Sequence, residues 1–145
     1  MSNDLVQFGL HKVSLPTLTI GAAINPALTT TVIKGPDGAR SIIAQANFIY
    51  GAGGTTVDVY VQTSLDRGAT WVDIMNFNFT TASAVKISKV DLSTALSASK
   101  APTDGSLTSN TIVDGLIGDQ FRLKYKSAGT YTGVNTIQVD LIIKG

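Results

Sequence analysis

Alternation of apolar and polar residues, which is the period of a β-strand, runs through most of this chain. The clearest case is TTVDVYVQTS at residues 55–64, where three valines occupy every second position. Comparable patterns predict further strands at 13–20, 29–34, 40–50, 70–79, 84–92, 119–127 and 134–144. We therefore predict an all-β fold of about eight strands, an antiparallel β-sandwich that is jelly-roll-like.

Glycine-rich turns separate these segments, and one long loop interrupts them. The GAGG run at 51–54 resembles a phosphate-binding loop, but a strand follows it where a helix with Lys and Ser or Thr would be needed, so we interpret it as a hairpin turn. Residues 93–110 are rich in Ser, Thr and Ala, and we expect a loop that is mobile or docked on a partner. The predicted organisation is an N-terminal arm at 1–12 and a single β-sandwich domain at 13–145.

Composition narrows the classes of partner. Hydrophobic residues make up 43% of the chain and charged residues only 14%, against about 25% in typical domains, which suggests that apolar surface meets another subunit. The net charge of +1 with scattered basic residues argues against nucleic acid and an anionic membrane as partners. The chain has no cysteine, and its first residues lack the pattern of a secretory signal, so we expect a cytoplasmic protein or one assembled there.

The stretch SLDRGATW at 64–71 fits the pattern S-x-D-x-G-x-T-W and resembles the Asp box of sialidases and related β-propeller proteins. In such hairpins a carboxylate and a hydroxyl bind backbone N–H groups across the turn, glycine supplies a positive φ and the aromatic ring packs beneath. A single box in a short chain is not a propeller. We therefore interpret the motif as a hairpin lock formed by Ser64, Asp66, Gly68, Thr70 and Trp71.

Candidate catalytic groups are few. Resemblance to a sialidase would imply an arginine triad and a Tyr–Glu nucleophile pair, but the chain has no Glu and three Arg in total. Asp58 and Asp73 are the nearest pair for a glycosidase with two carboxylates, and we interpret them as solvent-facing strand residues. His11 is the only histidine and lacks a serine–carboxylate context. We therefore predict no catalytic residues and no enzymatic activity.

Candidate groups for binding a metal ion or a sugar are also present in the chain. Asp104, Asp114 and Asp119 lie in or near loops but lack the spacing of a calcium loop, so we predict no metal site and no cofactor. Four aromatic residues are a platform for carbohydrate or, alternatively, packing groups of strands; they are Tyr60, Trp71, Tyr125 and Tyr131. A glycan therefore stays open as a ligand, and a carbohydrate-binding module is one alternative.

Two runs, VDVYVQTSLDRGATWVDIMNFNF and DQFRLKYKSAGTYTGVNTIQVDLIIKG, resemble small virion structural proteins of tailed bacteriophages. In length and strand pattern the chain is similar to jelly-roll decoration or cement proteins of phage heads. The resemblance implies a non-enzymatic protein on the capsid exterior, assembled in the host cytoplasm, that binds between subunits of the major capsid protein. It also implies self-association as a homodimer or homotrimer. The structural alternative is a tail or head–tail connector component.

The N-terminal arm supplies the candidate partner contacts, which are Leu5, Val6, Phe8 and Leu10. Such an apolar segment is suited to adding to the sheet edge of a neighbour. The competing interpretation makes it a strand of the domain's own sheet. The 93–110 loop is the second candidate contact, with disorder as its alternative.

Overall fold

The computed structural model describes residues 10–36 and 38–145, and these form an all-β protein. None of the described residues lies in a helix long and apolar enough to cross a membrane. The strands are β1 (Leu10–Ser14), β2 (Leu18–Thr19), β3 (Leu28–Thr29), β4 (Ile33–Lys34), β5 (Ser41–Ile49), β6 (Ala52–Gly53), β7 (Thr56–Ser64), β8 (Val72–Phe79), β9 (Ala84–Asp91), β10 (Gln120–Ala128), β11 (Tyr131–Thr132) and β12 (Thr136–Lys144).

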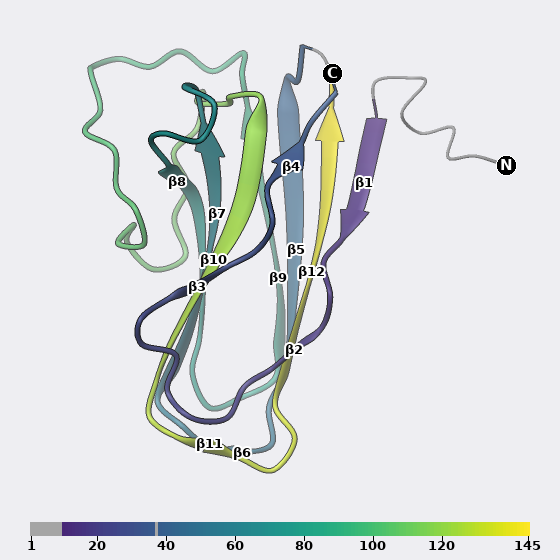
Figure 1. The fold of residues 1–145 in the computed structure, drawn as a ribbon, viewed down its shortest axis with the longest axis vertical. Helices are drawn as coiled ribbons and strands as arrows, with labels where there is room; N and C mark the ends of the chain where they lie inside the picture. Colours follow the sequence, from purple (N-terminus) through teal and green to yellow (C-terminus); the bar gives the residue numbers. More distant parts are fainter. Residues whose placement is uncertain (1–9, 37) are drawn as a thin grey trace, which may run out of the picture.

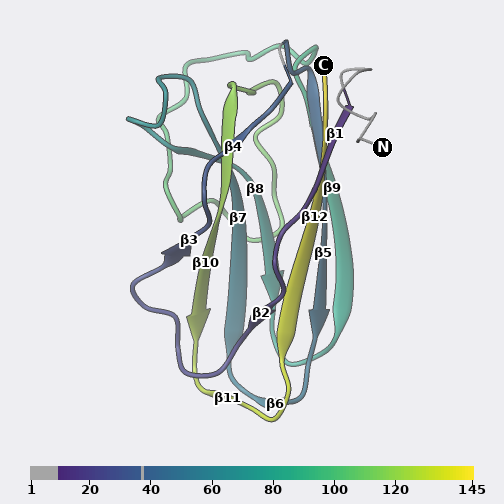
Figure 2. The same ribbon diagram turned by 45° about the vertical axis from the view of Figure 1, so that its right-hand side comes forward.

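Two antiparallel sheets face each other (Figure 1). Sheet A has the order β1-β12-β5-β9, and the short β2 continues the line of β1 along β12. Sheet B has the order β3-β10-β7-β8, and β4 pairs with the same edge of β10 as β3. The small pair β6 and β11 lies at the lower end of the sandwich in Figures 1 and 2.

The strand order is that of a jelly roll. We count β1 with β2 as the first strand position and β3 with β4 as the second, and each later strand of the two large sheets as one further position. The eight positions are then ordered 1-8-3-6 in sheet A and 2-7-4-5 in sheet B. Every connection crosses from one sheet to the other except the hairpin between β7 and β8, so the chain wraps around the core. The predicted jelly-roll-like sandwich is confirmed.

Alternation along the strands builds the core. In β5 and β12 every second residue is fully buried between the sheets. The buried set of these two strands is Ile42, Ala44, Ala46, Phe48, Ile137, Val139, Leu141 and Ile143. The other sheet contributes aromatic and valine side chains, such as Phe77 and Phe121, to the same cluster. Removal of this apolar surface from water is the main force that holds the two sheets together.

The long predicted strands match the structure to within two residues, whereas the first two are interrupted. The segment predicted at 13–20 is split into β1 and β2 by residues 15–17, which include Pro16, and the segment at 29–34 is split into β3 and β4. β1 begins at Leu10, so residues 10–12 of the predicted arm pair with β12 in the domain's own sheet. The other predicted contacts, Leu5, Val6 and Phe8, lie outside the described residues.

Candidate interaction surface

The outer face of sheet B is covered by the protein's own chain. The connection from β9 to β10, residues 92–119, runs along the edge strand β8 and over the outer face of its sheet (Figure 1). Its backbone bonds that edge: the N–H of Asp73 donates to Thr103 O at 2.8 Å, that of Asn76 to Thr111 O at 3.0 Å, and that of Val113 to Ile74 O at 2.9 Å. The long loop therefore extends sheet B instead of projecting from it.

A buried carboxylate anchors this loop. Asp73 has no exposed surface, and its two oxygens accept the backbone N–H groups of Gly105, Ser106 and Leu107 at 2.8 to 3.1 Å. The hydroxyl of Thr103 and the amide of Gln62 add two side-chain bonds, at 2.9 and 2.8 Å. A buried charge is tolerated when hydrogen bonds surround it in this way. The expectation of a solvent-facing Asp73 is wrong, because the loop covers it.

Asp104 connects the same loop to β10. It accepts hydrogen bonds from Gln62 at 2.6 Å and Lys124 at 2.8 Å, and Arg122 lies 3.6 Å away. Burial opposes ionisation of Asp104, but the bonds from Lys124 and Gln62 and the two cationic charges outweigh it and lower its pKa. These contacts hold the loop against β10, and the side chain of Asp104 itself stays half-exposed.

Two further predicted polar residues, Asp58 and Asp114, also make internal hydrogen bonds. Asp58 accepts the side-chain amides of Asn76 and Asn78 at 3.2 and 3.0 Å. Asp114 accepts the N–H of Asp91 at 2.8 Å, and this bond is the main reason that its pKa is lowered. Among the described residues no group of three or more His, Cys, Asp or Glu side chains is placed to hold a metal ion. Neither Asp58 nor Asp73 lines either of the two surface depressions described below.

Residues 64–71 form the hairpin between β7 and β8. The hydroxyl of Ser64 accepts the N–H of Gly68 at 2.8 Å and donates to Asp66 at 2.9 Å, while Asp66 accepts the N–H of Thr70 at 2.7 Å. Gly68 has φ +89°, and Trp71 is buried beneath the turn, with the Arg122 guanidinium 4.4 Å from its ring centroid. The side chains of Ser64 and Asp66 thus bond within the turn itself.

The four aromatic residues weighed as a sugar platform are all buried, with 3 to 8% of their surface exposed. Burial raises the pKa of Tyr60 and of Tyr125 to about 12; the charges of Asp58 and Asp73 add to the effect at Tyr60. Tyr131 packs edge-on against Phe48 in the core and donates to Thr80 O. A flat exposed ring is needed to stack on a sugar, and these rings offer none.

In contrast, no described segment covers the outer face of sheet A, and apolar side chains cross it diagonally. Ile142 on β12 pairs directly with Ile43 on β5. Ile87 on β9 lies one row further along, opposite Gln45, and is 64% exposed. We call the diagonal row the apolar stripe; it consists of Leu10, Ile142, Ile43, Ile87 and Val85. Ile43, Val85 and Ile87 are exposed, whereas Leu10 and Ile142 are partly buried. A contiguous exposed apolar row of this kind is typical of contact surfaces.

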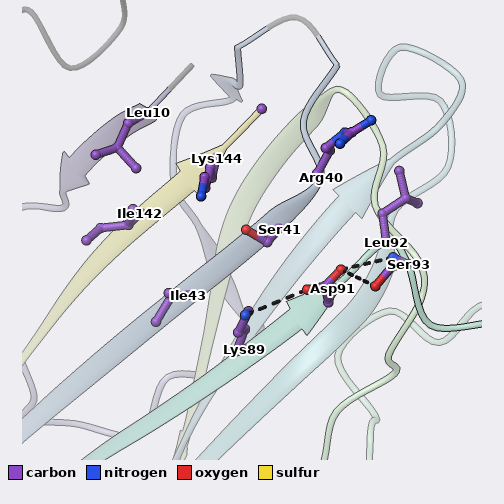
Figure 3. Close-up of a pocket in the computed structure, with 11 residues that line it drawn as sticks. Leu10, Arg40, Ser41, Ile43, Lys89, Asp91, Leu92, Ser93, Ile142 and Lys144 are labelled. Atoms are coloured by element: carbon purple, nitrogen blue, oxygen red, sulfur yellow. Dashed lines mark hydrogen bonds and ion pairs between the residues drawn. The ribbon is translucent and has the colours of Figure 1, made fainter. Parts of the chain in front are cut away.

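The upper part of the stripe lies in an open depression of about 640 Å³ (Figure 3). Its floor is formed by Leu10, Ile142 and Ile43 from three neighbouring strands, and Lys144 and Lys89 border it. Lys89 lies 3.6 Å from Asp91. A second depression at the upper end of the sandwich, near the Asp-box hairpin, is lined by Lys34, Arg67 and others. The second depression also has apolar lining residues, such as Leu65 and Ile117. Only the first of these two contains residues of the apolar stripe, and its apolar floor with a charged rim is the usual anatomy of a protein interface.

Comparison of the chain with protein-family models and with curated protein sequences found no match. The candidate surface therefore rests on the geometry of sheet A. Sequence reasoning identified Leu10 but missed Ile142, Ile43, Val85 and Ile87. Alternation was the available signal: these residues occupy the positions opposite to the core set in β12, β5 and β9, where polar residues are expected.

Proposed function

We propose that this chain is a non-enzymatic virion structural protein, a capsid decoration or cement protein that binds between major coat subunits and stabilises a phage head. The observation that carries the proposal is the uncovered apolar stripe on the outer face of a jelly-roll sandwich. The internal hydrogen bonding of Asp58, Asp73 and Asp104 supports a structural role over an enzymatic one, because these carboxylates already serve the fold.

The outer face of sheet A has an area suited to one modest contact with a coat protein, repeated in many copies. Four strands about 4.8 Å apart and nine residues of about 3.4 Å each give a face of roughly 600 Å². This area is of the same order as the roughly 800 Å² per partner of a standard interface. One contact of that kind holds only modestly, but many copies around a shell act together through effective concentration. We propose that the stripe lies against the coat and that residues 1–9, which precede Leu10, add to the contact.

Coat binding is testable with particles from the source of the chain that lack this protein. Ile43→Asp places a charge in the middle of the stripe, whereas Val134→Asp changes a 72% exposed valine outside it. We expect Ile43→Asp to lose at least tenfold in affinity for the particles and Val134→Asp to bind like the unchanged protein. Equal binding by both variants, with unchanged melting temperatures, would refute coat binding through the stripe.

A further inference from the structure

β9 is an edge strand with an open side. It pairs with β5 on one side, and on its other side no strand of sheet A follows; this edge lies at the right of Figure 2. The other edges differ. The chain's own loop bonds the edge of β8, β3 and β4 have two residues each, and β1 has five residues next to a part of the chain, residues 1–9, that the structure does not describe. β9 is therefore the longest described edge that the domain leaves open, and open edges invite pairing.

The direction of each backbone group in β9 follows from the ladder. The N–H of Leu92 donates to Arg40 O, so the even-numbered residues of β9 make the bonds to β5. The odd-numbered residues then direct their N–H and C=O groups outward. At Asp91 the outward N–H is bonded to Asp114. Within residues 10–36 and 38–145 no hydrogen bond is found for the outward groups of Val85, Ile87 and Lys89.

We propose that a second copy of this chain pairs antiparallel with β9 across a two-fold axis at Ile87. This register places Ile87 opposite Ile87 of the second copy, and Val85 opposite its Lys89. The three open residues of each copy would exchange about six backbone hydrogen bonds. A register shifted by one step toward the C-terminal end of β9 would place Val85 opposite Asp91, whose N–H is already bonded to Asp114. A shift the other way would place Lys86 opposite Lys86 of the second copy, a pair of like charges.

Side chains favour the same register. Val85 and Ile87 are 56% and 64% exposed, so pairing would bury apolar surface that the monomer leaves in water. Lys89 stands across from valine, and Lys86, on the inner face, stands across from Ser88, so no like charges oppose each other. The apolar stripe of one copy then continues into that of the other at Ile87, over one continuous sheet.

The pairing does not depend on the proposed capsid role and is tested on the purified protein alone. The chain lacks cysteine, so single cysteines report neighbours cleanly. Directly opposed strand residues have Cα atoms about 5.5 Å apart, within the range for a disulfide. Ile87→Cys should form a covalent dimer of most chains on mild oxidation. Ile49→Cys is the control, because Ile49 is 51% exposed on the same outer face but lies on the interior strand β5.

The molar mass in solution, measured by light scattering after gel filtration, is the second test. We expect twice the chain mass of 15.1 kDa for the unchanged protein and the single mass for Ile87→Asp, in which two carboxylates would meet at the axis. Ile49→Asp should remain dimeric. A monomeric unchanged protein, a trimer, or equal cross-linking of both cysteine variants would overturn pairing through β9.

Discussion

Both carboxylate oxygens of Asp73 on β8 lie 2.8 to 2.9 Å from the backbone nitrogen of Gly105, 32 positions further along the chain. This relationship holds the long loop on sheet B and closes one face and one edge of the sandwich. It also creates the asymmetry on which the candidate function depends. One outer face is covered by the protein itself, and the other leaves isoleucine and valine side chains exposed.

Asp73→Asn should destabilise the protein by about 3 kcal/mol. The amide keeps the size of the side chain but replaces one acceptor with a donor, so buried N–H groups of residues 105–107 lose their partner. Urea unfolding would measure the loss, and hydrogen exchange should accelerate at residues 103–113. Asp119→Asn, at an exposed position, serves as the control. If both variants were equally stable, Asp73 would not anchor the loop.

Ser64→Ala should cost about 1 to 2 kcal/mol, because the hydroxyl joins Gly68 and Asp66 across the turn and is fully buried. Ser97→Ala changes an exposed loop serine and should have no measurable effect. Thermal unfolding of both variants provides the comparison. An unchanged midpoint for Ser64→Ala would show that the bonds of Ser64 do not stabilise the hairpin.

Gly118→Ala tests the close approach between the end of the loop and β7. A Cβ atom at this position would lie 2.0 Å from the backbone oxygen of Ser64, so the chain must shift, and we expect a loss of about 2 kcal/mol or more. Gly21→Ala is the matched control, because a Cβ there would meet nothing within 4 Å. Comparable stability of the two variants in denaturant would mean that the loop does not pack against β7 as described.

Alkaline pH should destabilise the protein through two buried tyrosines. The folded pKa of Tyr60 and of Tyr125, about 12, lies above the ordinary value of 10.0, so the folded state holds these protons more tightly. Their contribution to stability is complete below pH 10 and is lost as the pH rises towards 12. Tyrosinate absorbance followed together with unfolding would measure this. Ionisation of Tyr125 near pH 10 in a folded protein would contradict the prediction.

Local pattern predicted the strands that form the sandwich but not the role of its polar residues. In β5 and β12 alternation alone gives the buried set, because each strand has one face in the core. In β8 nearly every residue is buried, since the loop covers the outer face as well. That covering depends on bonds between Asp73 and residues 32 or more positions away, which no local pattern encodes. The break at residues 15–17 carried a signal in Pro16.

The apolar stripe likewise could not be predicted from the local sequence pattern. Ile43 and Ile87 read as ordinary strand residues until the register places them one row apart on an uncovered face. Sequence composition indicated that apolar surface was in excess, and it took the pairing of β5 with β9 and β12 to locate it. Leu10 was found in advance because it lies in an apolar N-terminal segment.

The capsid role is tested most directly by the copy number of this chain relative to the major coat protein in purified particles from its source, measured by quantitative mass spectrometry. A protein that binds between coat subunits over the whole head should be present in hundreds of copies per particle. A handful of copies would assign the chain to the tail or the head–tail connector, and its absence from the particles would contradict a virion role altogether.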